Sequence, residues 1–481
     1  MKRLLLFFVL TSISFSLFAQ PGENNIRVTI KPFKDRVVYL GYYFGKGQYV
    51  LDSVKLDSDG KGAFTTKEKL WGGIYFVVFP GKRNFSEFVI DKNHDFSIEI
   101  SDTLDAMASA KFTNSPENDR YRSYQKFVGE QGTKINALDR ELSMAKTKAD
   151  TTEIQSSVVK ERKKIIEWRD EFKKKNPDDI LTAFFKALDE PTVPPAEQHP
   201  NHKYDSSFAY YYYKSHYWDG VAFNDERLIR TPFYEAKLDR YFDEVLLQVP
   251  DTIYKECEKM TEAAKSNSET FKFLLDKFIR KYVNPKYMGQ DIIFVKLYEK
   301  YFRDDQKYDW VNEKYTKFLF DRYWSIVANT IGKPAYDFTM TDTLGAVKRL
   351  YDYSDKHIVV CFWDPTCGHC QQEVPKLDSL FQHKWKKMGV NLIGVMVDGG
   401  KEPWMKYIRE HHLDGWTHLY QTEEQRTAEK TSSSASYRQL FDIFQTPMLY
   451  LLDKDKHIVA KRLNYEQLNE LIDRKEKNSK E

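Results

Sequence analysis

Residues 359–370 read VVCFWDPTCGHC. An apolar run ends at Asp364-Pro365, and two cysteines three positions apart follow it. Apolar residues then recur with helical spacing from Val374 to Met388. The stretch therefore predicts a buried strand that leads into a pair of thiols at the entrance of a helix.

The position of the two thiols determines their expected chemistry. The first turn of a helix carries N–H groups without helical partners and the positive end of the helix dipole, so a sulfur there is stabilised as a thiolate. Cys367 is therefore the predicted nucleophile, and Cys370, one turn later, can attack a mixed disulfide formed at Cys367. An imidazolium at His369 would lower the thiol pKa further and shift the pair toward oxidising chemistry.

Two other roles exist for cysteines at this spacing. Half of a zinc site would need a second pair of ligands, but the chain has no other Cys-x-x-Cys, and His411 and His412 are adjacent rather than a turn apart. A permanent structural disulfide is the stronger alternative, because an extracytoplasmic location would permit it. The combination of strand, dithiol, helix and a late Thr-Pro pair favours redox activity over both.

The same residues resemble a known family, the thioredoxin-like thiol-disulfide oxidoreductases. The matching features are the strand end Phe362-Trp363, the Cys-Gly-His-Cys motif, Pro375 five residues after the second cysteine, and Thr446-Pro447 before an apolar strand. Glu373 matches a glutamate that the thioredoxins of cytochrome c maturation carry beside their cysteines. The resemblance is to this cytochrome-maturation and AhpC/TSA-related branch, in proteins of the bacterial envelope type.

The resemblance implies roles for particular side chains. In the family the late proline is cis and faces the dithiol, so Pro447 is expected to present a backbone edge to a client polypeptide. The implied site residues fall into two sets: the catalytic set is Cys367, Cys370, Glu373 and His369, and the substrate-binding set is Thr446, Pro447 and Trp363.

The chain also departs from thioredoxin itself. Thioredoxin has a buried aspartate before the Phe-Trp pair, where this chain has Cys361, and a tryptophan before the first cysteine, where this chain has Thr366. The buried proton acceptor must lie elsewhere, and Glu373 is the candidate. About fifty residues separate Asp398 from Pro447, which leaves room for an inserted helix and strand, as in the cytochrome-maturation branch. A peroxiredoxin is disfavoured, because that family carries Thr or Ser where this chain has Asp364.

The N-terminus has the pattern of a secretory signal peptide. Two basic residues precede an apolar run, Leu4 to Leu10, that is too short to span a membrane, and a polar turn follows at Pro21-Gly22. Cleavage is expected near Ala19 or Gln20, with an uncleaved anchor as the alternative. The pattern predicts export to the periplasm or cell envelope.

Composition limits the classes of partner. Without Lys2 and Arg3 the chain has 72 basic and 71 acidic residues, so no strong field attracts nucleic acid or an anionic membrane. The expected partners are protein thiol or disulfide clients and a redox partner protein that donates or accepts electrons. No bound cofactor and no metal are required.

The N-terminal and middle regions differ in pattern. From Asn25 to about Ser101, short alternating runs separated by Gly, Pro and Asp turns predict a small antiparallel sandwich, similar to a β domain of unknown function that often precedes thioredoxin-like domains. From about Glu117 to Asn176, two long helices are expected, with a break near 150–152. Further helices follow to about Asn329.

The predicted architecture is therefore multidomain. It has an N-terminal all-β sandwich, an α-helical middle domain and a C-terminal α/β thioredoxin-like fold with a mixed sheet covered on both faces. The expected boundaries are 1–20 for the signal peptide, 21–112 for the β domain, 113–330 for the helical domain and 331–478 for the thioredoxin-like domain.

The predicted function is that of an exported thiol-disulfide oxidoreductase. The alternative is an envelope binding or docking protein whose thioredoxin-like module is vestigial or structural. The direction of electron flow stays open, because His369 favours oxidation or isomerisation, whereas the likeness to cytochrome-maturation proteins favours reduction.

Overall fold

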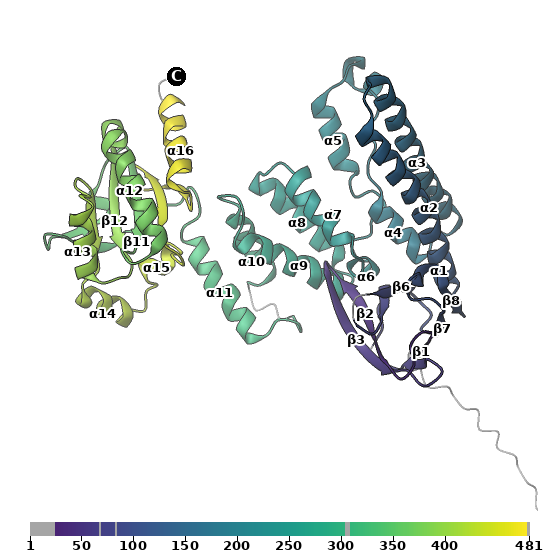
Figure 1. Ribbon diagram of the computed structural model, residues 1–481. Helices are drawn as coiled ribbons and strands as arrows, with labels where there is room; N and C mark the ends of the chain where they lie inside the picture. Colours follow the sequence, from purple (N-terminus) through teal and green to yellow (C-terminus); the bar gives the residue numbers. More distant parts are fainter. Residues whose placement is uncertain (1–24, 67–68, 82–83, 304–307, 479–481) are drawn as a thin grey trace, which may run out of the picture. The chain divides into compact units, whose positions relative to one another are not determined.

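The computed structural model describes residues 25–66, 69–81, 84–303 and 308–478 (Figure 1). The chain divides after Val245 into two compact units. The predicted signal peptide, residues 1–20, lies outside the described residues. The predicted class is confirmed: a strand-rich N-terminal region, a helical middle and a C-terminal mixed sheet. The exact domain boundaries stay a prediction.

The first unit begins with a β-sandwich of two four-stranded sheets, ordered β4-β1-β7-β8 and β3-β2-β5-β6. Apolar side chains of both sheets alternate inward and form one core, which includes Val28, Leu40, Val77 and Ile98. The strands are β1 (Asn25–Ile30), β2 (Val37–Phe44), β3 (Gly47–Lys55), β4 (Lys61–Phe64), β5 (Gly73–Val78), β6 (Phe85–Ile90), β7 (Asp95–Ile100) and β8 (Ala110–Thr113).

The expectation of a purely antiparallel domain was wrong in one pair. Strand β1 runs parallel to β7, with Asn25 opposite Asp95 and Ile30 opposite Ile100. Local alternation predicts that a strand exists but not which distant strand it pairs with. Strands β4 and β8 were not predicted, because each has only four residues and neither has an apolar run.

Two long helices follow, α2 (Pro116–Met144) and α3 (Lys148–Lys175), after the short α1 (Ala106–Ser109). The break between them lies at residues 145–147, several residues before the expected position. Thr147 is the cap, since its side-chain oxygen accepts a hydrogen bond from the N–H of Asp150. The remaining helices of this unit are α4 (Ile180–Leu188), α5 (Ser206–His216), α6 (Glu226–Ile229) and α7 (Tyr234–Arg240).

The helical middle is shared between the two units. The second unit starts with four helices and continues directly into the C-terminal sheet. These helices are α8 (Pro250–Ala264), α9 (Ser268–Val283), α10 (Asp291–Tyr301) and α11 (Glu313–Val327).

The C-terminal sheet has seven strands in the order β10-β9-β13-β12-β11-β14-β15. Its central strand β11 is buried along its whole length and pairs parallel with β12 and antiparallel with β14. The strands are β9 (Thr339–Asp342), β10 (Val347–Arg349), β11 (His357–Trp363), β12 (Val390–Met396), β13 (Thr417–Tyr420), β14 (Met448–Asp453) and β15 (Ile458–Lys461).

Both faces of this sheet are covered, as expected. Val359, Cys361 and Trp363 face one apolar core with α12, α13 and α16, whereas Val360 and Phe362 face a second core with α15. Strand β13 and three helices, α13, α14 and α15, occupy the predicted insertion between Asp398 and Pro447. The helices are α12 (Gly368–His383), α13 (Lys401–Glu410), α14 (Glu423–Thr431), α15 (Tyr437–Leu440) and α16 (Tyr465–Asn478). Among the described helices, none is long and apolar enough to cross a membrane.

His418 is a buried histidine of the C-terminal sheet. It lies on β13 with 6% of its surface exposed, stacked on Trp416, and its Nε2–H donates to the carbonyl of Leu413 at 2.8 Å. Burial lowers the pKa of His418 to about 4. The ring is therefore held neutral inside the domain.

This burial predicts a loss of stability in mild acid. Below about pH 6.5 His418 binds a proton in the unfolded chain, whereas in the folded chain it stays neutral down to about pH 4. The contribution of His418 to the free energy of unfolding is therefore fully present above pH 6.5 and is lost as the pH falls from 6.5 to 4. The loss amounts to about 3 kcal/mol. In thermal melts between pH 7 and 4.5, His418→Asn should lose less Tm on acidification than the wild type.

The exposed His383→Asn is the matched control, and its Tm should follow the wild-type Tm at every pH. Parallel acid losses in the wild type and His418→Asn would contradict the assignment.

Candidate redox site

The end of strand β11 and the start of helix α12 position the two cysteines. Cys367 is the N-cap of α12, and its N–H donates to the carbonyl of Asp364 at 3.2 Å. The Asp364 carboxylate accepts hydrogen bonds from the N–H and the hydroxyl of Thr366, both at 2.7 Å. This tight turn brings the chain from the sheet to the helix and leaves Cys367 half-buried at its surface.

The surroundings of Cys367 favour its thiolate. Burial by itself raises the pKa of this thiol, but hydrogen bonds from the Thr446 side chain and from the N–H groups of Cys370 and His369 outweigh it and hold the pKa below its usual value. The two N–H groups belong to the first helical turn, where they have no helical acceptor. The Cys367 Sγ also lies 3.4 Å from the carbonyl oxygen of Thr446.

Cys370 lies in the opposite environment. It is fully buried, and burial raises the pKa of its thiol to about 12, with the nearby charge of Cys367 acting in the same direction. The N–H of Asp364 donates to its Sγ at 3.4 Å. Both thiols are free. The pair therefore combines an accessible, acidic thiol with a sheltered, weakly acidic one.

The loop before strand β14 forms the other wall of the site. The Thr446–Pro447 peptide bond is cis, as the resemblance implies. Thr446 contacts Cys367, and both Thr446 and Pro447 are partly exposed. The loop thus brings two partly exposed residues beside the sulfur of Cys367.

Behind the dithiol lies a buried third thiol, Cys361. Burial raises its pKa well above the usual range, and the charges of Cys370 and Glu373 add to that effect. Glu373 itself is half-buried on α12. Cys361 and Cys370 belong to the same apolar core, and Glu373 lies on α12, the helix that carries Cys370.

His369 and Trp363 differ from expectation in their surroundings. His369 is exposed, and the group that it gives to Cys367 is its backbone N–H. Trp363 is fully buried and packs edge-on against Tyr407, with ring centroids 5.4 Å apart. Trp363 has no exposed surface, and its contacts are with the apolar core behind the dithiol.

Sequence reasoning missed two groups beside the dithiol. Tyr407 on α13 donates to the carbonyl of Gln371 at 3.5 Å, and its pKa is raised by burial and by the charge of Cys370. Gly399 approaches Asp364 so closely that a Cβ there would lie 2.5 Å from the carboxylate. Both come from the insertion between β12 and the Thr-Pro loop, and no local motif indicated that they reach the site.

Comparison with known proteins assigns the three regions. Residues 331–461 match the model of the AhpC/TSA family, and residues 24–121 and 145–323 match two domains of unknown function, DUF4369 and DUF5106. Residues 331–461 form a thioredoxin-like domain of the thiol-disulfide oxidoreductase family. The predicted family is thus confirmed for this part of the chain.

Similar curated proteins are thiol-disulfide oxidoreductases named ResA. The chain is 35% identical over 83 residues to the protein of Geobacillus kaustophilus, covering 17% of this chain and 45% of that one. It is 23% identical over 129 residues to the protein of Bacillus thuringiensis subsp. konkukian, covering 27% and 67%. The chain thus spans less than half of the first relative.

Two solved structures are similar to parts of this chain. A domain of a possible thiol-disulfide isomerase from Cytophaga hutchinsonii is 36% identical, with 31% of this chain and 95% of that chain covered and a TM-score of 0.28. A thioredoxin-like protein from Bacteroides caccae is 21% identical, with 59% and 97% covered and a TM-score of 0.44.

The contrast between the two thiols predicts selective alkylation of the reduced protein. At pH 7, iodoacetamide should modify Cys367 at least about a hundredfold faster than Cys370, because the buried thiol has almost no thiolate at that pH. Peptide mapping by mass spectrometry gives the two rates. The fast reaction should disappear in Cys367→Ser and persist in Cys361→Ser, and equal rates at both cysteines would contradict the assignment.

Proposed function

We propose that this protein is an exported thiol-disulfide oxidoreductase that exchanges disulfides with protein clients through Cys367 and Cys370. The observation that supports this most directly is the asymmetry of the pair. The accessible thiol at the N-terminus of α12 has a lowered pKa, and the buried one has a raised pKa. This asymmetry suits a reaction in two steps, in which Cys367 attacks the client disulfide first and Cys370 displaces the client afterwards.

In the first proposed step, the Cys367 thiolate attacks one sulfur of a client disulfide. The client S–S bond breaks, a bond forms between Cys367 and the client, and the second client sulfur leaves as a thiolate. The N–H groups of His369 and Cys370 stabilise the attacking anion before the step. The high pKa of Cys370 keeps that thiol protonated during this step.

In the second step, Cys370 loses its proton and attacks the Sγ of Cys367. The mixed disulfide breaks, the client leaves with both sulfurs reduced, and the protein retains a Cys367–Cys370 disulfide. Glu373 is the proposed proton acceptor. Glu373 lies on α12, the helix that also carries Cys370, and Cys361 takes the position of the usual buried aspartate.

The client would lie along the Thr446–Pro447 loop. This backbone is partly exposed beside Cys367, so an extended client segment can bind its edge by main-chain hydrogen bonds. A redox partner protein would then return two electrons to the disulfide, or accept them when the reaction runs as an oxidation. The exchange needs no bound cofactor.

Export is part of the proposal and rests on the sequence of the first twenty residues. An oxidising compartment such as the periplasm or cell envelope offers disulfide clients. The alternative, a binding protein with a vestigial module, is disfavoured, because such a module has no need for an accessible thiol with a lowered pKa beside a sheltered one.

A trapping experiment tests the client step. Cys370→Ser should accumulate a mixed disulfide with a disulfide-bonded peptide, because nothing can displace the client from Cys367. Non-reducing electrophoresis and mass spectrometry would detect the adduct. Cys367→Ser should form none, and Cys361→Ser should turn over normally. An adduct in Cys367→Ser, or none in Cys370→Ser, would contradict the assigned order of attack.

The role of Glu373 is tested by its pH dependence. Glu373→Gln should slow resolution at least about tenfold and shift the pH–rate profile to higher pH, since deprotonation of Cys370 then depends on hydroxide or solvent. Stopped-flow kinetics of peptide disulfide reduction measures both effects. The exposed Glu402→Gln on α13 is the control and should match the wild type. A profile unchanged by Glu373→Gln would remove this residue from the mechanism.

A further inference from the structure

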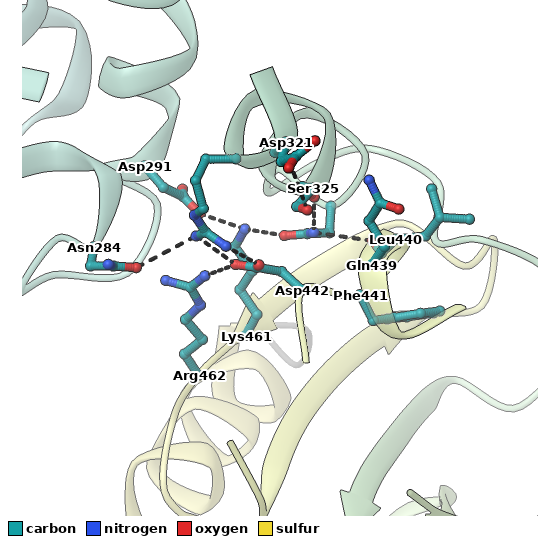
Figure 2. A network of polar contacts seen from close by, with 12 residues as sticks. Asn284, Asp291, Asp321, Ser325, Gln439, Leu440, Phe441, Asp442, Lys461 and Arg462 are labelled. Atoms are coloured by element: carbon teal, nitrogen blue, oxygen red, sulfur yellow. Dashed lines mark hydrogen bonds and ion pairs between the residues drawn. The ribbon is translucent and has the colours of Figure 1, made fainter. Parts of the chain in front are cut away.

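A buried ionic cluster joins helices at the start of the second unit to the segment that precedes the Thr446–Pro447 loop. Figure 2 shows Asp442, Lys461, Arg462 and Asp291 within it. At its centre is the carboxylate of Asp442, whose side chain is only 4% exposed. The two terminal nitrogens of Arg322, on α11, donate to its two oxygens at 2.5 and 3.1 Å. Arg462, just after β15, donates to the same carboxylate. A bidentate hydrogen bond between a guanidinium and a carboxylate fixes both the position and the plane of the carboxylate.

A second set of contacts holds the same segment of chain. Asn329, which follows α11, donates to the carbonyl of Leu440 at 3.0 Å. Its side-chain oxygen accepts from the Nζ of Lys461 at 2.5 Å, and Lys461 also pairs with Asp291 of α10 at 2.6 Å. The Lys461 and Asp291 side chains are 1% and 3% exposed, respectively. Residues 440–442 are thus bound to helix α11 and to Asn329 just after it. Asn329 is in turn linked through Lys461 to α10.

This segment leads directly to the reactive sulfur. Three residues separate Asp442 from Thr446, whose carbonyl lies 3.4 Å from the Cys367 Sγ. On the far side, the loop enters β14, which is paired with the central strand β11. The loop is therefore held at both ends, at Asp442 by Arg322 and at β14 by its pairing with β11.

Charge balance alone does not account for Arg322. Arg462 already neutralises Asp442 from within residues 331–478, and Lys461 is neutralised by Asp291. Arg322 therefore adds a positive charge in excess of what the buried carboxylate requires, and burying a charge is costly unless its hydrogen bonds are made. Its distinctive contribution is geometric: it joins helix α11 to the loop.

We propose that Arg322 is a positioning residue for the redox site, which fixes Asp442 and thereby holds Thr446 against the sulfur of Cys367. The helices before the thioredoxin-like domain are then part of the support of the dithiol rather than a separate spacer. The hydrogen bond from Thr446 that favours the Cys367 thiolate depends on this support. The consequence for turnover rests on the proposed function, whereas the effect on Cys367 itself does not.

The test compares Arg322→Met with the wild type in the full chain. Methionine keeps an apolar stem of similar length but donates no hydrogen bond, and Arg462 still neutralises Asp442. With Thr446 less firmly held, alkylation of Cys367 by iodoacetamide at pH 7 should slow about threefold to tenfold, and its pH midpoint should rise. Lys317→Met, on the same helix, breaks the exposed ion pair with Asp321 and should alkylate like the wild type.

The readout separates positioning from a structural role. A lower Tm with an unchanged alkylation midpoint would mean that Arg322 only stabilises the fold, and this result would overturn the proposal. If Arg322→Met fails to fold, the shorter polar Arg322→Gln takes its place, with the same two readings. Alkylation of Cys367 needs no client. If the protein catalysed no disulfide exchange, the proposed function would be refuted, but the alkylation rates would still test the role of Arg322.

Discussion

The redox site depends on one contact, the hydrogen bonding of the Cys367 sulfur by the free N–H groups of the first turn of α12. This contact requires the helix to begin directly after Cys367, which in turn requires strand β11 to end at Trp363 and the chain to turn at Asp364. Burial alone would make Cys367 a poor nucleophile, and the hydrogen bonds reverse that effect. Cys370, which lacks comparable support, keeps the high pKa that burial imposes.

The support extends outward from that turn in two directions. Behind it, the fully buried Trp363 and the half-buried Glu373 surround the sheltered thiols. On the other side, the carbonyl of Thr446 lies 3.4 Å from the sulfur, and Asp442, shortly before this loop, is bound by Arg322. A redox pair made of two cysteines thus depends on contacts from α11 to β15, which explains why the short motif by itself describes the site incompletely.

The sequence was most informative where one local pattern determines the structure. The continuous apolar run of β11 and the helical spacing after Cys370 predicted the strand, the turn and the helix, and the resemblance predicted the cis bond at Pro447. It was least informative about partners distant in sequence. No local sequence pattern marks three features of the structure: the parallel pairing of β1 with β7, the burial of His418 and the Arg322–Asp442 pair. Each depends on residues that are distant in the sequence. An arginine on an amphipathic helix is usually solvated, so no signal distinguished Arg322 from its neighbours.

The most direct test of the account is the equilibrium reduction potential of the Cys367 and Cys370 pair. It would be titrated against dithiothreitol and glutathione, with mass tagging of the free thiols. The account predicts one reversible two-electron transition between about −270 and −120 mV, a range in which thioredoxin-like pairs exchange with clients. A value near the upper end would indicate an oxidant or isomerase, and one near the lower end a reductase. A disulfide that neither reagent opens, or thiols that never pair, would contradict the central claim.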